Sequence, residues 1–198
     1  WSDLDELSRV VPLIARIYPN GQADVNQFQA AGGTAAFGAW LVEAGLLDGS
    51  AITVWDRPLG ESFAEPALDA QGRFAPRPPP ARPVDDQVLR KPDAPFQPDG
   101  GLRLLDGNLG RAVVKVSAVK PEHRVVEAPC RVFEDQLAVV KAFQGGEFTG
   151  DVVVVVRHQG PKANGMPELH KLTPPLGVLL DRGYQVALVT DGRMSGAS

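Results

Sequence analysis

The chain has 198 residues, of which 43% are hydrophobic and 22% are charged, and its formal net charge is −4. This composition is typical of a globular protein with one or two domains, and the negative charge argues against nucleic acid or an anionic membrane as a partner. The apolar runs are shorter than the roughly 20 residues that span a bilayer, and no signal segment opens the chain, so we expect a cytoplasmic protein.

The first 56 residues are predicted to be mainly helical. Ser2 is a candidate N-cap, and the apolar residues after it recur at the spacing of one helical face: Leu4, Leu7, Val10, Val11, Ile14 and Ile17. Pro19-Asn20-Gly21 should end this helix. Residues 52–55, Ile-Thr-Val-Trp, predict one short strand.

Residues 23–33 allow two interpretations. Asp24 and Gln27 form the pattern of a capping box, Gly32-Gly33 would interrupt the helix, and Thr34 would cap a further helix that runs to residue 45. On this view the polar residues only mark helix ends. Alternatively, Asp24 and Asn26 belong to a ligand loop, because they crowd polar groups next to a diglycine whose backbone can approach an anion closely.

Residues 57–101 differ sharply in composition from the rest. They hold ten of the eighteen prolines, with Arg77-Pro78-Pro79-Pro80 at the centre. Because proline fixes φ and removes a hydrogen-bond donor, we expect irregular chain here, most simply a connection between two packed units. A polyproline ligand for a partner domain is the alternative.

Beyond this segment the sequence predicts strands, one helix and a βαβ unit. Strands are expected at 102–105 and 111–119, extended pieces at 125–126 and 130–133, and a helix at 135–143. Val152 to Val156 are consecutive β-branched residues, which indicates a strand buried on both faces of an α/β layer. Pro174-Pro175 suit the first turn of a helix that Gly183 would end, and a strand follows at 185–189.

Two polar loops follow the two strands of this βαβ unit. Residues 159–168 contain two glycines and two prolines, which should prevent regular structure, and they place an amide, a cation and a carboxylate in one loop. Residues 190–196 again place polar groups between glycines. Since open α/β sheets bind ligands at the carboxyl ends of their strands, we expect Glu168 and Ser195 to share a site.

Three long motifs carry a family resemblance. NGQADVNQFQAAGG (20–33), GPKANGMPELHKLTPP (160–175) and LVTDGRMSGAS (188–198) resemble the IlvD/Edd dehydratases, iron–sulfur enzymes that remove water from dihydroxy acids and sugar acids. The match is nearest to the branch that acts on 6-phosphogluconate. The resemblance implies an α/β fold with a helical segment of a preceding domain (1–56), a proline-rich linker (57–101) and a swivelling β/β/α, β-barrel-like domain (102–198).

The resemblance also implies the chemistry. It assigns Ser195 as the catalytic base and Glu168 as a magnesium ligand beside a cluster, expected to be 4Fe-4S. It places a phosphorylated sugar acid near the remaining candidate substrate-binding residues, which are Asn164, His170, Lys171, Asp191, Arg193, Asp24 and Asn26. The family's cluster cysteines belong to its N-terminal domain, so we expect no iron–sulfur ligand in this chain, and a homodimer for the full-length enzyme.

The single cysteine, Cys130, is predicted to be a small buried residue of a strand. One cysteine cannot hold an iron–sulfur cluster, which generally needs about three or four, so we expect the isolated chain to be inactive. His123 is expected on the surface and His158 at a strand end without chemistry. The chain starts at Trp1 and stops inside a glycine-rich loop, so we expect it to be part of a longer enzyme.

Two alternatives to this function stay open. The first is a dehydratase of the same family that acts on a non-phosphorylated sugar acid or a dihydroxy acid. The second is a non-catalytic binding domain that has kept the swivelling fold.

Overall fold

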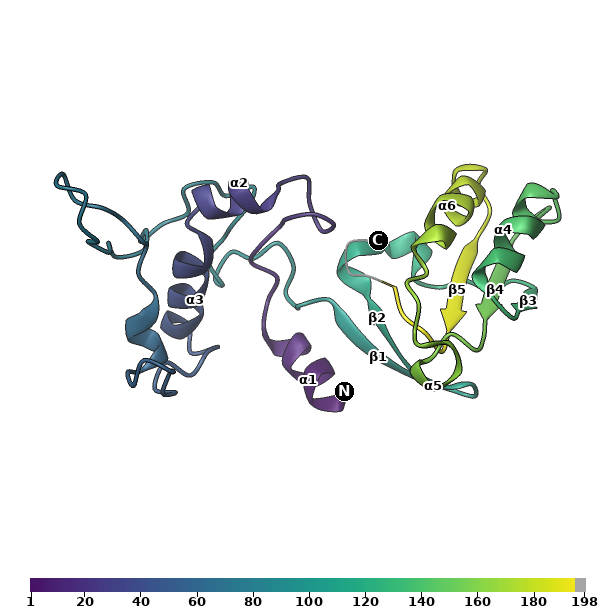
Figure 1. The fold of residues 1–198 in the computed structure, drawn as a ribbon, viewed down its shortest axis with the longest axis horizontal. Coiled ribbons are helices and arrows are strands. Elements are labelled where there is room, and N and C mark those ends of the chain that lie inside the picture. Colours follow the sequence, from purple (N-terminus) through teal and green to yellow (C-terminus); the bar gives the residue numbers. More distant parts are fainter. Residues whose placement is uncertain (195–198) are drawn as a thin grey trace. The chain divides into compact units, whose positions relative to one another are not determined.

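The computed structural model describes residues 1–194 and divides the chain into two compact units, Trp1–Ala118 and the residues from Val119 onward. Helices dominate the start of the first unit, which ends in a two-stranded antiparallel sheet, and the second unit contains a three-stranded parallel sheet. Figure 1 shows these helices and the strands of both sheets. The predicted α/β class with a helical N-terminal segment is confirmed, and the described strands form two open sheets and no closed barrel.

The first helix is shorter than its apolar pattern predicts. α1 spans Ser2–Val10, and Val11 is already extended, with φ −86° and ψ 115°. Val11 precedes Pro12, and the proline ring disfavours helical backbone in the residue before it. Ile14 and Ile17 therefore lie in extended chain outside the helix, where Ile14 is buried.

The next two helices begin and end close to the predicted residues, except that one predicted cap is wrong. α2 spans Val25–Ala30, and the Asp24 carboxylate accepts a hydrogen bond from the Gln27 backbone, which completes the predicted capping box. α3 spans Gly33–Glu43 and starts after Gly32, whose φ of +122° is accessible mainly to glycine. Thr34 lies inside the helix, so its prediction as the cap was wrong.

The proline-rich segment is mostly irregular, as predicted, yet it contributes to the first core. It contains one short 3₁₀ helix, η1 (Leu59–Ser62), and isolated bridges such as Glu65 to Arg77. Val88 and Leu89 are buried together with Trp40 of α3, whose indole Nε1 donates to the Pro80 carbonyl at 3.1 Å. The strand predicted at 52–55 is wrong, because Ile52 makes only an isolated bridge.

The first unit ends in the predicted pair of strands, but the second strand stops at Lys115 and does not reach residue 119 as predicted. β1 (Leu102–Gly107) pairs with β2 (Gly110–Lys115), with Leu102 opposite Lys115 and Gly107 opposite Gly110. Two short 3₁₀ segments follow, η2 (Val116–Ala118) and η3 (Pro121–His123). The extended piece expected at 125–126 forms no strand.

The second unit contains a parallel sheet in the order β3-β4-β5. The strands are β3 (Cys130–Phe133), β4 (Val152–Val156) and β5 (Val186–Thr190). α4 (Gln136–Gln144) connects the first two, while α5 (Pro161–Asn164), η4 (His170–Leu172) and α6 (Thr173–Asp181) connect the last two. The predicted βαβ unit is therefore confirmed. The loop at 159–168 was expected to lack regular structure, but α5 forms one turn there, started by Pro161.

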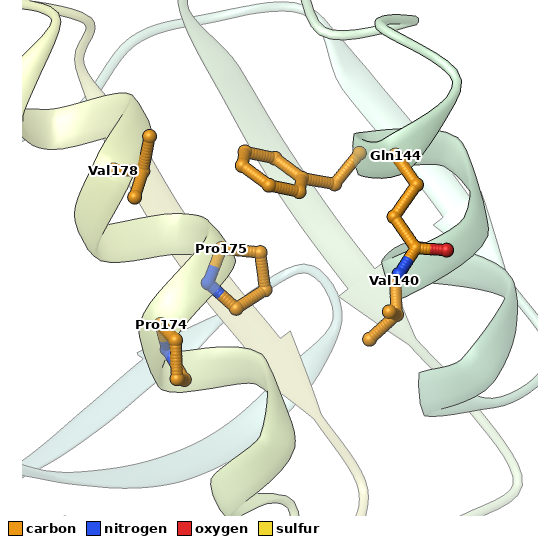
Figure 2. Close-up of a pocket in the computed structure, with 6 residues that line it drawn as sticks. Val140, Gln144, Pro174, Pro175 and Val178 are labelled. Atoms are coloured by element: carbon orange, nitrogen blue, oxygen red, sulfur yellow. The ribbon is translucent and has the colours of Figure 1, made fainter.

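The core of this unit lies between one face of β4 and the helices. Val152, Val154 and Val156 are buried, whereas Val153 and Val155 on the opposite face are only half-buried. The prediction of a strand buried on both faces was therefore wrong for the second face. Val139 of α4 and Leu179 of α6 complete this core. Between the two helices runs a shallow apolar groove, lined by Val140, Phe143, Gln144, Pro174, Pro175 and Val178 (Figure 2). None of the helices in the described part of the chain has the length and apolar character needed to cross a membrane.

Candidate functional site

The candidate site lies at the carboxyl edge of the parallel sheet. β4 and β5 run in register, with Val156 opposite Thr190, so the loops after them start side by side. In Figure 1 the arrows of both strands point to the edge where α5 lies. Parallel strands bring the segments that follow them to one edge, which is where ligands bind in open α/β sheets.

Asp191 ties the two loops together. Its Oδ1 accepts a hydrogen bond from the Gln159 backbone NH at 2.9 Å, and its Oδ2 accepts one from the Gly160 NH at 3.3 Å. These NH groups, that of Gln159 first, hold the pKa of the Asp191 carboxyl below its ordinary value, because they stabilise the charged form. The Asp191 carboxylate thus joins the loops as an anion.

The two loops also approach so closely that a side chain at position 192 would clash and one at position 160 would be tight. A Cβ atom on Gly192 would lie 2.8 Å from the Cβ of Gln159, and one on Gly160 would lie 3.3 Å from the Asp191 carbonyl oxygen. Contacts below 3.0 Å force one side to move. The glycines in both loops therefore allow the contact that Asp191 holds.

Gln159 is a site residue that the sequence reasoning missed. Only 1% of it is exposed, and its side-chain amide nitrogen donates toward the backbone carbonyls of Glu134, Arg157 and His158 at 3.1–3.2 Å. It thereby joins the ends of β3 and β4 beneath the loops. The available signal was a glutamine between the end of an apolar strand and a glycine, a position where a buried amide can pair with carbonyls left free at strand ends.

Glu168 and Arg193 form an ion pair between the two loops. Arg193 Nη1 lies 3.3 Å from Glu168 Oε2, and the two residues also form a parallel backbone bridge. The Arg193 side chain is 54% exposed and the Glu168 side chain is 38% exposed, so a ligand can reach both. A guanidinium binds carboxylates or phosphates, and a carboxylate binds hydroxyl groups or a divalent cation. The pair therefore suits a polyhydroxy acid.

The Glu168 segment is also held from the side of α4. Gln136 Nε2 donates to the Glu168 carbonyl at 3.4 Å, whereas Gln136 Oε1 is buried without a hydrogen-bond partner. Next to it, Glu134 accepts from Arg157 Nε at 2.8 Å, and His158 Nε2 lies 3.1 Å from Glu134 Oε2. The hydrogen bond from Arg157 holds the pKa of Glu134 below its ordinary value. His158 thus has an acidic neighbour at the strand end.

The other predicted residues of this unit are exposed near the same loops. Asn164 is the last residue of α5, while His170 and Lys171 lie on η4. Leu169 and Leu172 on either side of that pair are fully buried, which fixes the segment and turns His170 and Lys171 toward solvent. The imidazole of His170 and the ammonium group of Lys171 are therefore accessible to a ligand.

Comparison with known proteins identifies the family. The family model described as dihydroxy-acid/6-phosphogluconate dehydratase C-terminal matches residues 87–198, and the corresponding N-terminal model matches residues 1–62. The chain belongs to this dehydratase family.

Comparison with individual proteins gives the same family. It is 60% identical to the phosphogluconate dehydratase of Pseudomonas aeruginosa, 58% to that of Zymomonas mobilis and 54% to that of Escherichia coli, in each case over the whole chain. The chain spans about a third of the length of these relatives, 32–33%.

Two predicted site residues belong to the first unit. Asp24 caps α2, and Asn26 lies exposed in that helix. The capping box confirms the helix-end interpretation of Asp24 and Gln27, while a ligand role for Asp24 or Asn26 stays a prediction. The predicted base, Ser195, lies outside the described residues.

The prediction that Cys130 is buried was wrong. It is exposed, not buried, because it starts β3, an edge strand, on the sheet face opposite the core. His123 is exposed, as predicted. Among residues 1–194, no group of three or more His, Cys, Asp and Glu side chains gathers in a way that could hold a metal ion.

Proposed function

We propose that this chain is part of a hydro-lyase that dehydrates 6-phospho-D-gluconate to 2-dehydro-3-deoxy-6-phospho-D-gluconate, the dehydration of the Entner–Doudoroff pathway. The observation that carries the proposal is the exposed Glu168–Arg193 pair at the sheet's carboxyl edge, in a chain 60% identical to a phosphogluconate dehydratase. The pair offers both charges that a sugar acid with many hydroxyl groups would use.

The reaction removes a proton from C2 and hydroxide from C3 of the substrate, which together leave as water. A double bond forms between C2 and C3, and the resulting enol takes up a proton at C3 and releases its C2 hydroxyl proton to give the 2-keto acid. The enzyme therefore needs a base near C2, charge stabilisation for the departing oxygen, and groups that hold the carboxylate and the phosphate.

The residues of this chain would divide these tasks. Ser195 is proposed as the base at C2, and a serine hydroxyl needs a nearby cation to lower its pKa enough for that role. Arg193 would hold a substrate oxyanion, while His170 and Lys171 would reach the phosphate. We propose that Asn164 and Asp191 contact the substrate's hydroxyl groups, Asp191 through lone pairs left beside its two backbone donors.

The cofactors fit this chain to different degrees. Mg²⁺ is commonly held by one or two carboxylates together with water and substrate oxygens, so the accessible Glu168 fits as one of its ligands. Bound there, Mg²⁺ would supply positive charge close to the substrate oxygens. An iron–sulfur cluster does not fit the residues present, because the sequence has one cysteine and it is exposed on an edge strand. We propose that the isolated chain is inactive, because it cannot hold the cluster by itself.

Substrate choice tests the proposal most directly. The full-length protein should turn over 6-phosphogluconate far faster than gluconate or a dihydroxy acid, measured as formation of the 2-keto acid. Preference for a non-phosphorylated acid would favour a dehydratase of the same family with another substrate. Binding of sugar acids without any turnover would favour a non-catalytic binding domain. The homodimer and the cytoplasmic location are part of the same proposal, and light scattering of the full-length protein tests the former.

Two substitutions in the full-length protein test the residue roles. Ser195→Ala should remove most of kcat, and turnover within about threefold of wild type, roughly 0.6 kcal/mol of barrier, would assign the base elsewhere. Glu168→Gln should lower both turnover and bound magnesium. Its matched control is Glu147→Gln, which also breaks an ion pair with an arginine, at 2.7 Å from Arg131, outside these loops.

A further inference from the structure

α1 is oriented with its polar side toward the rest of the first unit. Asp5 is only 8% exposed; its Oδ1 accepts the Leu104 backbone NH at 3.0 Å, and its Oδ2 accepts Arg9 Nε at 2.9 Å. One turn further, Ser8 Oγ accepts the Leu102 NH at 2.9 Å. The helix is thus attached to β1 by hydrogen bonds between its polar residues and the strand backbone.

The apolar side of the same helix faces solvent. Leu4, Leu7 and Val10 follow one another at three-residue spacing and are 50%, 58% and 64% exposed, and Trp1 just before the helix is 69% exposed. An amphipathic helix of a globular protein normally turns such a stripe toward a core. We define these four residues as the outer α1 face.

We propose that the outer α1 face packs against the remainder of the N-terminal dehydratase domain within the same, longer polypeptide. The N-terminal family model matches residues 1–62, which include this helix, and the relatives are about three times as long as the chain. The inference rests on family membership and not on the choice of substrate.

The size of the face favours a partner in the same polypeptide over a second copy. A stable complex of separate chains typically buries about 800 Å² and 20–30 residues on each side. The outer α1 face offers four large apolar side chains on a helix of nine residues. A segment of the same polypeptide needs less area, because its covalent link provides a local concentration in the millimolar range.

The test compares one substitution in two lengths of the protein. Leu7→Ser should leave the melting temperature of the 198-residue chain unchanged, because the side chain already faces solvent. In the full-length protein the same change should lower the melting temperature by several degrees or abolish soluble expression. Glu6→Ser is the matched control on the same exposed part of α1, and Leu7→Met is the conservative variant; both should keep the wild-type melting temperature in both lengths.

Three results would overturn the proposal. The first is a full-length Leu7→Ser protein that melts with the Glu6→Ser control, since the face would then stay uncovered. The second is a lower melting temperature of the 198-residue Leu7→Ser chain, since the face would then pack within that chain. The third is a 198-residue chain that is a dimer in light scattering and becomes a monomer with Leu7→Ser, while the melting temperature of the full-length protein does not change. The outer α1 face would then pack against a second copy of the chain.

Discussion

Replacing Gln159 with leucine should destabilise the second unit by about 2 to 4 kcal/mol. The Gln159 amide is buried and donates toward three backbone carbonyls. Its NH₂ group has two hydrogens, so at most two of these bonds are fully formed at once. These hydrogen bonds are partly buried, and an acceptor that loses its donor in such a place costs about 1–3 kcal/mol, while the added apolar burial of leucine offsets part of the sum.

Urea unfolding of the 198-residue chain, followed by far-UV circular dichroism, measures this effect. Gln185→Leu is the matched control, because Gln185 is exposed and the same change there should stay within about 0.5 kcal/mol. Fluorescence of Trp1, Trp40 and Trp55 follows the first unit only and should be unchanged. A Gln159→Leu chain as stable as the Gln185→Leu control would refute the view that this amide holds the strand ends together.

Three further predictions concern the loops and one helix cap. Gly192→Ala should cost about 1–3 kcal/mol, because its Cβ would lie 2.8 Å from that of Gln159, whereas Gly177→Ala in α6, with no atom within 4 Å, should gain about 0.5–1 kcal/mol; thermal melts of both compare them. Because backbone NH groups lower the pKa of Asp191, its contribution to stability is complete above its ordinary pKa of 3.8 and is lost as the pH falls through the lower folded pKa. Asp191→Asn should therefore flatten the acid limb of stability in urea titrations, and an unchanged limb would contradict this. Asp24→Ala should cost the first unit about 1 kcal/mol in tryptophan-detected unfolding, and no loss would mean that the capping box is not formed.

Local sequence patterns are sufficient to specify several elements of this fold. Five β-branched residues at 152–156 produce a strand, although only one of its faces is fully buried, Asp24 and Gln27 cap α2 through their own side chains, and Pro174-Pro175 lie in the first turn of α6. Each of these effects acts within a few residues, so the pattern alone specifies it. The placement of Glu168 at the sheet's carboxyl edge also followed, because parallel strands bring their carboxyl ends to one edge.

Contacts between distant residues could not be predicted from local patterns. The apolar pattern of α1 predicts a buried stripe, but Asp5 and Ser8 bind backbone NH groups almost a hundred residues away and turn that stripe outward. Cys130 is exposed because it lies on the face of the sheet opposite the core, in register with the half-buried Val153. The contacts of Asp191 with the Gln159 loop and the Glu168–Arg193 pair depend on strand order and register, which arise from burial summed over the whole unit and leave no mark at any single position of the chain.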